Sequence, residues 1–333
     1  MKKILSISIA AYNQEKYLDR CIQSLLIPSL EKIEVIIVND GSKDKTSEIA
    51  HKYADKYPES IIVIDKANGH YGSCANASLK IATGKYYKLL DADDYFDSNE
   101  FEQYVKALED SNADMVITTH VICNQTPIEI SPKNVMISKV YPQSEIDFTA
   151  LGMTSCLGMH GVTYKMDILR KVNLTLTEKC CATDAEYCYY PIASCKTVQF
   201  FDFKLYMYQT NIEGQDTTIV SESQKEQKYI VAKRMLDDYI KNKSENKNIR
   251  HNQRLVLERS LIGYYGIYIL HFKKNKTDDL RIKEMDNMLL KADAESYYNL
   301  NSVQTFKIKF IKLYRALGVT FSRITPILSK LKK

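Results

Sequence analysis

The amino-terminal part of the chain alternates short apolar runs with polar turns and amphipathic segments. Apolar runs that stop at turn-forming residues predict buried strands at residues 4–10, 34–38, 61–64 and from 86 onward. Apolar residues recur at helical spacing between them and predict a helix in each interval, the first over about residues 15–26. Strands that alternate with helices form parallel βαβ units, so we expect an α/β fold with a mostly parallel, Rossmann-like sheet flanked by helices.

The pattern changes twice further along the chain. A helix at 98–108 and a strand at 115–119 are followed by a stretch with weak periodicity, interrupted by Pro127, Pro132 and Pro142. From about residue 221 the pattern is helical and polar. We therefore expect one domain over residues 1–218 and a helical region over 219–333.

The carboxy-terminal tail predicts a basic amphipathic helix, interrupted near Pro326. Its apolar positions, at three- and four-residue steps, are Phe306, Phe310, Leu313, Leu317, Phe321, Ile324, Leu328 and Leu331. Its basic positions are Lys309, Lys312, Arg315 and Arg323. Such a helix can lie on an anionic membrane surface or pack its apolar face on protein, and the sequence leaves both open.

Charge separates this tail from the rest of the chain. Residues 296–333 contain eight Lys or Arg and no acid, which leaves −3 on the rest of a chain whose total is +5. An acidic body argues against a nucleic-acid-binding surface. The eight cysteines follow no metal-site spacing, and Cys180 and Cys181 are adjacent.

No segment indicates export or membrane insertion. The first apolar run follows Lys2 and Lys3, is broken by Ser6 and Ser8, and lacks a cleavage site, so we expect a strand there and not a signal peptide. No stretch of about 18 uninterrupted apolar residues is present. We expect a cytoplasmic protein with free thiols.

Acidic side chains follow the fourth predicted strand. Asp91, Asp93 and Asp94 lie within four residues, at the carboxyl end where open α/β sheets bind ligands. Carboxylates packed this closely repel one another unless a cation neutralises them, and their oxygens suit Mg²⁺ or Mn²⁺. A metal held by one or two carboxylates keeps positions open for a diphosphate. The alternative is an acidic turn that caps the next helix.

Four stretches in order resemble the inverting family 2 glycosyltransferases, which have the GT-A fold. They are SISIAAYNQEKYLDRCIQSLL, EVIIVNDGSKDKT, NGHYGSCANASLKIATGKY and KLLDADDYF. The resemblance covers roughly the first 125 residues closely and about 90 more loosely. The resemblance implies an enzyme that transfers a sugar from a nucleotide-diphosphate sugar to a hydroxyl of a cell-surface glycan or lipid-linked precursor. The expected donor is a UDP-sugar. It also implies Mg²⁺ or Mn²⁺ as cofactor and work at the inner face of the cell membrane.

The resemblance also assigns residues. The implied nucleotide-binding residues are Ala11, Tyr12, Glu15, Asp40, Asn68, Gly69, Asn76, Asp91 and Ala92. Among them, Tyr12 borders the base and Asp40 accepts a hydrogen bond from the uracil ring. Asp93 is the implied metal ligand, with Asp91 as a second. Because Cys74 and Ala75 stand where relatives carry Arg, Lys66 or Lys88 would have to bridge the diphosphate.

The catalytic base and the later loops follow from the same resemblance. Asp184 in TDAEY stands where the family places its base, with Glu186 as the alternative, although Thr183 replaces the usual Glu. His160 is implied near the acceptor, and Gln215 belongs to the loop that covers the donor. On spacing alone, a helix N-terminus capped by Thr183 or Asp184 fits equally well.

Three other classes of function fit the sequence less well. A strand ending in D-x-D is also the nucleophile pattern of haloacid-dehalogenase-like phosphatases, although Tyr95 and the position after the fourth strand fit that family poorly. A nucleotidyltransferase is disfavoured, because this sequence has no glycine-rich loop after the first predicted strand. The missing Arg and the Thr183 substitution are compatible with a nucleotide-sugar-binding or scaffolding protein that does not catalyse transfer.

Overall fold

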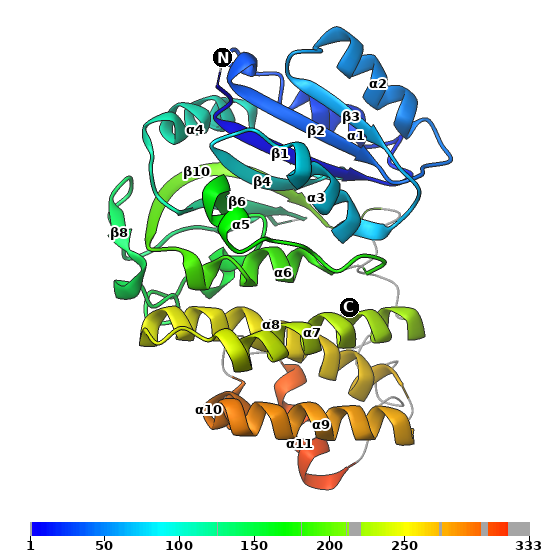
Figure 1. Cartoon of the computed structure of the whole chain (residues 1–333), viewed down its shortest axis with the longest axis vertical. Coiled ribbons are helices and arrows are strands. Elements are labelled where there is room, and N and C mark those ends of the chain that lie inside the picture. The colour runs from blue at the N-terminus through cyan, green and yellow to red at the C-terminus, as the bar shows by residue number, and fades with distance from the viewer. Residues whose placement is uncertain are drawn as a thin grey trace. The chain divides into compact units, whose positions relative to one another are not determined.

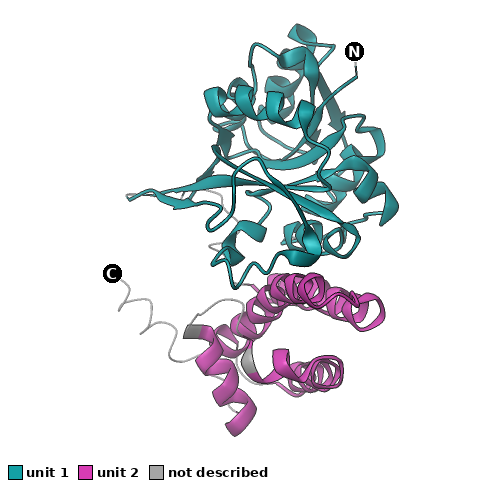
Figure 2. Cartoon of the chain, turned by 90° about the vertical axis from the view of Figure 1, so that its left-hand side faces the viewer, with its two compact units in different colours: residues 1–214 teal, residues 215–333 magenta. Residues whose placement is uncertain are grey.

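The structure is a computed structural model that describes residues 2–124, 126–180, 182–210, 212, 221–272, 275–300 and 306–318. The chain divides into two compact units, residues 1–214 and 215–333, coloured teal and magenta in Figure 2. In the described residues, all strands belong to the first unit, and the second unit is helical.

Ten strands of the described chain form one mixed sheet in unit 1, ordered β3-β2-β1-β4-β9-β6-β10-β5, with β7 beside β6 and β8 beside β10 (Figure 1). The strands are β1 Leu5–Ala11, β2 Ile33–Asn39, β3 Ile61–Asp65, β4 Tyr86–Asp91, β5 Tyr95–Phe96, β6 Met115–Cys123, β7 Ile128–Ile130, β8 Val140–Pro142, β9 Val162–Lys165 and β10 Thr197–Gln209. The first four strands are parallel to one another, and β9 lies antiparallel between β4 and β6. The predicted parallel βαβ core is therefore confirmed.

Helices cover the sheet and explain its apolar strands. In unit 1 the described helices are α1 Leu18–Gln23, α2 Thr46–Lys56, α3 His70–Ile81, α4 Ser98–Asp110, α5 Met166–Lys171 and α6 Asp184–Tyr189. Helix α3 packs on β1 and β2, α2 on β2 and β3, and α4 on β10. Every residue of β2 is buried, whereas β3 at the edge of the sheet is partly exposed. Strands covered on both faces become continuous apolar runs.

The first helix is shorter than predicted, because the loop before it is held by side chains of the next loop. Asn13 has φ +53°, and its backbone N donates to Oγ of Ser42 at 3.0 Å. The backbone N of Glu15 donates to Oδ2 of Asp44 at 3.0 Å. These bonds fix residues 13–15 as a turn, so the helix begins at Leu18 and not near Glu15.

Unit 2 consists of α7 Glu222–Asn242, α8 Lys247–His271, α9 Lys276–Ala292, α10 Ala294–Asn299 and α11 Phe306–Leu317 among its described residues. Side chains cap the three long helices: Ser221 accepts from the backbone of α7, Asn246 from that of α8, and Asn275 from that of α9. Helix α8 is buried along most of its length and packs against α7 and α11.

Helix α11 leaves part of its predicted apolar face exposed. Ile311 and Tyr314 are buried, and the Tyr314 hydroxyl donates to Oδ1 of Asp279 at 2.6 Å. Leu313 and Leu317, among the apolar positions predicted for the tail, are 41% and 62% exposed. Arg315, predicted on the polar face, is instead held by Asp286, with Nε donating to Oδ1 at 3.1 Å. The ion pair and Tyr314 outweigh the leucines in setting how α11 packs.

Two further expectations concern the described residues as a whole. The seven cysteines that the structure describes are all free thiols, as predicted. Over the described part of the chain, no helix has both the length and the apolar character needed to cross a bilayer.

Candidate active site at the carboxyl edge of the sheet

The carboxyl ends of four parallel strands lie next to one another along one edge of the sheet. Ala11 and Asn39, the last residues of β1 and β2, are register partners, and Ala10 is the partner of Asp91 in β4. Asn39 also pairs with Asp65 at the end of β3. Paired strands are about 4.8 Å apart. The loops that carry the predicted site residues therefore leave the sheet from adjoining positions.

Asp40, just after β2, holds the glycine-containing loop that follows β3. Its Oδ1 accepts hydrogen bonds from Nζ of Lys66 at 2.6 Å and from the backbone N of Gly69 at 2.9 Å. Its Oδ2 accepts from the backbone N of His70 at 2.8 Å. The N–H group of a base would therefore join a carboxylate that already accepts three hydrogen bonds, out of a capacity of about four.

Gly41 and Asn68 complete this pair of loops. Gly41 has φ +74°, and a Cβ there would lie 3.1 Å from the backbone N of Asn68. The side-chain amide of Asn68 donates to the backbone O of Asp40 at 3.0 Å. The predicted nucleotide loop is thus shaped by direct bonds to the loop after β2.

The loop after β1 presents one free aromatic ring. Tyr12 is 48% exposed, which leaves a face for stacking on a base. Glu15 is exposed, and its Oε2 accepts from the backbone N of Lys45 at 3.0 Å. The side chains of Ala11 and Ala92 are buried and apolar, so only their backbone atoms could contact a polar ligand.

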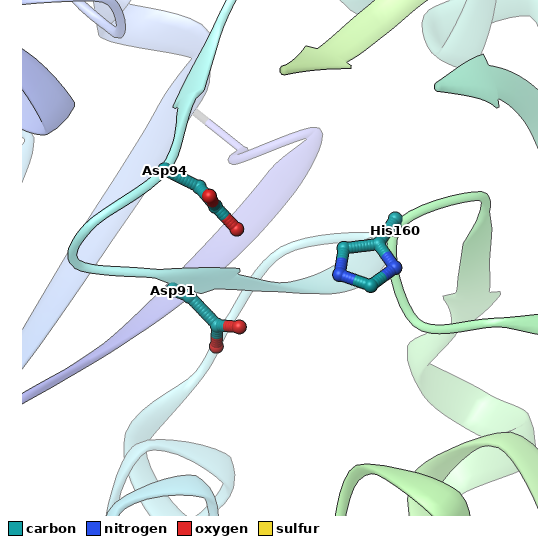
Figure 3. Close-up of side chains that lie close together, drawn as sticks. All are labelled: Asp91, Asp94 and His160. Carbon is teal, nitrogen blue, oxygen red and sulfur yellow. The ribbon is translucent and has the colours of Figure 1, made fainter. Parts of the chain in front are cut away.

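Asp91, Asp94 and His160 form a cluster in which one ligand atom of each lies within 4.8 Å of the others. Figure 3 shows the two carboxylates extending from β4 and the turn after it towards the imidazole, which comes from the loop before β9. Oδ1 of Asp91 is buried and has no hydrogen-bond partner in the described residues. The cluster therefore contains an oxygen that protein groups leave unsatisfied.

Asp93, the predicted metal ligand, does not belong to this cluster in the described residues. The reason is a turn: β4 ends at Asp91, and the backbone N of Asp94 donates back to the O of Asp91 at 3.0 Å. Side chains two apart share a face only while the backbone stays extended. The turn places Asp94 beside Asp91, and the charge of Asp93 acts on both from close by.

Burial and repulsion keep protons on this cluster when no cation is bound. Burial, with the charges of Asp91 and Asp93, raises the pKa of Asp94 to about 9. Burial, with the charge of Asp93, raises the pKa of Asp91 to about 7. Asp94 also accepts from the Tyr206 hydroxyl and from the backbone N of Gln209, both at 2.7 Å. These bonds favour its ionised form but do not offset the burial.

His160 stays neutral in this setting. Burial, with the positive charges of His120 and Lys88, lowers the pKa of His160 to about 3. Its ring packs against those of Tyr208 and Tyr206, with centroids 4.4 and 4.8 Å away. A neutral imidazole keeps a lone pair that can bind a metal.

The cluster fits a divalent cation. A doubly charged ion would remove the repulsion that holds protons on Asp91 and Asp94, and would satisfy the orphaned Oδ1 of Asp91. Two carboxylates and one imidazole are a mixed oxygen and nitrogen donor set, which suits Mn²⁺, while Mg²⁺ takes oxygen ligands almost exclusively. Asp91, Asp94 and His160 are the residues that would hold it.

Asp184 is the first residue of α6, and its charge reaches the cluster. It raises the pKa of Asp91 and that of Tyr71. Thr183 makes no side-chain capping bond, and its Oγ1 is buried without a partner in the described residues. The described contacts therefore give no support to a capping role for Thr183.

Glu186 and Asn76 hold one segment of backbone. Glu186 is fully buried, and its carboxylate accepts from the backbone N and Oγ1 of Thr177 at 2.6 and 2.8 Å. The amide of Asn76 donates to the O of Leu176 at 2.9 Å and accepts from its backbone N at 2.8 Å. A further bond joins Asn76 to Glu178 at 3.1 Å. Both predicted site residues thus fix the segment that leads to Asp184.

Sequence reasoning did not select Tyr71 or Tyr206, and it ranked Asp94 below Asp93. Tyr206 joins the two acidic residues: its hydroxyl donates to Asp94 and accepts from the backbone N of Asp91 at 3.1 Å. Tyr71 stands in the quoted NGHYGS stretch, which was the one available signal. Gln215, predicted in the donor loop, lies outside the described residues.

The comparisons with known proteins agree on one family. A sequence model described as Glycosyl transferase family 2 matches residues 6–172. EpsJ of Bacillus subtilis strain 168, an uncharacterized glycosyltransferase, is 40% identical over 116 residues, 35% of this chain and 33% of that protein. Chondroitin synthase of Pasteurella multocida strain Pm70 is 32% identical over 173 residues, 52% of this chain and 17% of that protein. The chain spans a third or less of these relatives.

A solved structure shares the fold. Residues 1–349 of TarS from S. aureus, in complex with UDP-GlcNAc, match with a TM-score of 0.64 and 18% identity, over 95% of this chain and 92% of that one. The likeness at this identity concerns the fold, and it confirms the expected GT-A type with a helical carboxy-terminal region.

Proposed function

The chain belongs to glycosyl transferase family 2, and on this premise we propose that it transfers a sugar from a nucleotide-diphosphate sugar to an acceptor hydroxyl with inversion at the anomeric carbon. The observation that carries the proposal is the convergence of Asp91, Asp94, His160 and the charge of Asp184 beside the loops that hold Asp40.

The nucleotide is proposed to lie along the loops after β1, β2 and β3. The exposed ring of Tyr12 would stack on the base, and Asp40 would accept from its ring N–H. UDP is the nucleotide we propose, since an imide N–H needs an acceptor. That TarS was solved with UDP-GlcNAc supports this choice.

The diphosphate is proposed to face the cluster of Asp91, Asp94 and His160, with Asp93 contributing charge. A divalent cation bound there, Mn²⁺ or Mg²⁺, would neutralise the departing nucleoside diphosphate. Two earlier candidates for bridging the diphosphate are otherwise engaged. Lys66 is bonded to Asp40, and Lys88 is fully buried.

Asp184 is the proposed base that takes the proton of the acceptor hydroxyl as the oxygen attacks the sugar. It is half-buried and within electrostatic reach of Asp91. Glu186 is a poor alternative, because it is fully buried with both oxygens bonded to Thr177. Its role is to hold the loop before Asp184.

The acceptor is proposed to be a hydroxyl of a cell-surface glycan or of its lipid-linked precursor. Relatives such as the chondroitin synthase are named for making polysaccharides, which supports this class. A lipid-linked acceptor would require work at the inner face of the cell membrane. The exposed Leu313, Leu317, Lys309 and Lys312 of α11 would suit contact with such a surface.

The proposal is tested by ligand binding and by turnover. In a thermal-shift panel of nucleotide-sugars with and without Mn²⁺, a UDP-sugar is expected to raise the melting temperature most, and more so with Mn²⁺. Release of UDP with a glycan acceptor should follow for that donor. Stabilisation by no nucleotide-sugar would refute the donor assignment, and binding without turnover on any acceptor would favour a scaffolding protein.

The base is tested by a pair of neighbouring variants. D184N removes the proton acceptor and is expected to lower transfer by roughly 10³-fold, within the range of general bases. E186Q keeps an oxygen that accepts from the backbone of Thr177, so transfer should stay within roughly tenfold of the wild type. If E186Q is as inactive as D184N in a folded protein, or if D184N keeps its activity, Asp184 is not the base.

A further inference from the structure

Lys88 is a buried lysine whose hydrogen bonds in the described part of the chain all go to backbone carbonyl oxygens, and burial lowers its pKa to about 7. It lies in β4, three residues before Asp91, and its side chain is completely inaccessible to solvent. Its Nζ donates to the O of His160 at 2.9 Å and of Val162 at 3.1 Å, with the O of Met159 at 3.4 Å. One side chain thus hydrogen-bonds the backbone of the loop that carries His160, both before and after the histidine.

The loop is held from its other side by β6. The backbone N of Thr118 donates to the O of Gly161 at 2.9 Å, and Oγ1 of Thr118 donates to the same oxygen at 3.3 Å. A Cβ on Gly161 would lie 2.7 Å from the O of Cys156, so the loop is tightly folded at this point. Lys88 from β4 and Thr118 from β6 therefore both hydrogen-bond this loop, which has little freedom to shift.

We propose that Lys88 is a positioning residue that fixes the His160 loop so that the imidazole faces Asp91 and Asp94. The burial of Lys88 and the acceptors of its N–H groups support this role. An ammonium removed from water is unfavourable unless all three of its N–H groups find acceptors, and here they do. The three oxygens are in turn left without their donor if the lysine is replaced. This inference rests on the proposed metal site.

The chain contains a matched control. Lys85, three residues before Lys88, also donates to backbone carbonyls, to the O of Glu109 at 3.0 Å and of Leu108 at 3.4 Å. Those carbonyls close α4 and not the loop of His160. Replacing Lys85 and Lys88 by Met makes the same chemical change in both places, and only the second touches the loop.

The test measures Mn²⁺ affinity directly, from the electron paramagnetic resonance signal of free Mn²⁺, and so does not depend on turnover. Five proteins are compared: the wild type, K88M, K85M, H160A and K88M/H160A, each shown to be folded by its melting curve in EDTA. K88M is expected to weaken Mn²⁺ binding by about tenfold, as for other residues that orient a ligand, and K85M to leave it unchanged. In the H160A background, K88M should have no further effect.

Three results would overturn the inference. One is wild-type affinity in K88M while H160A is weakened, and another is an equal loss from K88M with and without His160. The third is a wild type that binds no Mn²⁺, which also removes the proposed metal site. If K88M does not fold, K88Q, which keeps two N–H donors, takes its place with the same dependence on His160. Normal Mn²⁺ binding without any transferase activity would refute the proposed function and leave this inference intact.

Discussion

At the scale of single residues, Asp94 gives the sharpest prediction, because its burial makes its protonation depend on folding. Its pKa in the folded protein is raised to about 9, above the ordinary value near 3.8 that it regains on unfolding. Between these values the folded state holds a proton that the unfolded state has lost, so stability falls as pH rises. D94N imitates the protonated form and should lose nothing over this range.

The measurement is urea unfolding of the wild type and D94N in EDTA at several pH values between 6 and 8. The stability of D94N relative to the wild type is expected to grow by about 1.4 kcal/mol for each pH unit. Taking the difference between the two proteins cancels the titrating groups that do not interact with Asp94, whereas Asp91 interacts with it and contributes to the difference. A difference that does not change with pH would show that Asp94 is ionised in the folded protein. Adding Mn²⁺ should favour the wild type.

Residues at strand ends were predictable, and residues brought by later strands were not. Asp40 and Asp91 follow apolar runs, and parallel strands bring their ends to one edge, so pattern alone placed them together. Tyr206 reaches the cluster from β10, which has register shifts between Phe200 and Tyr206. A shift of one residue changes the face on which a side chain lies, and no local pattern announces it.

At the scale of elements, the segment 176–179 ties α3 to the start of α6. The backbone N of Lys179 donates to the O of Gly69 at 2.7 Å, and Asn76 and Glu186 hold Leu176 and Thr177. The loop expected to bind the nucleotide and the residue expected to act as base are therefore braced by one stretch of chain. The sequence showed both ends but not the brace, because the contacts between Asn76 and Leu176 join residues 100 apart.

Gly72 is where this brace is most sensitive. A Cβ at Gly72 would lie 2.1 Å from the O of Thr177, far inside van der Waals contact with backbone. G72A must displace the segment, so we expect a loss of stability of about 1–3 kcal/mol from overpacking, together with a loss of transfer. Urea unfolding and UDP release measure the two effects on the same protein.

Gly263 provides the control for this prediction. It lies inside α8, and a Cβ there meets no atom within 4 Å. G263A should stabilise the protein by about 0.5–1 kcal/mol, because alanine favours a helix over glycine, and transfer should not change. Equal behaviour of the two variants would mean that segment 176–179 moves freely and does not brace Asp184.

At the scale of the whole molecule, positive charge is concentrated at the carboxy-terminal end, where residues 296–333 contain eight Lys or Arg and no acid. The sequence predicted a basic amphipathic helix correctly over Phe306–Leu317 and left open whether its apolar face packs on protein; in the structure Leu313 and Leu317 of that face are exposed. Periodicity alone grouped Leu313 and Leu317 with the apolar face of the helix. It could not foresee that Asp279 and Asp286 of α9 would hold Tyr314 and Arg315 instead.

The exposed side of α11 is suited to an anionic membrane surface. Leu313 and Leu317 are exposed beside Lys309 and Lys312, so the solvent-facing side of α11 combines apolar and positive groups. A lysine near an anionic lipid surface contributes about 1 kcal/mol, and leucines that enter the interface add to it. K309Q/K312Q is therefore expected to weaken binding to phosphatidylglycerol-containing vesicles by roughly 30-fold, and L313S/L317S should weaken it on its own. Co-sedimentation measures both.

Leu280 provides a control for non-specific apolar binding to vesicles, since it is 59% exposed on α9 but does not belong to the α11 face. L280S should bind vesicles like the wild type. Added salt should weaken wild-type binding more than that of K309Q/K312Q, because screening acts on the charges that this variant has lost. If the wild type ignores anionic vesicles, or if L280S fails as badly as L313S/L317S, α11 does not dock on lipid, and an acceptor in the membrane would have to be reached by another surface.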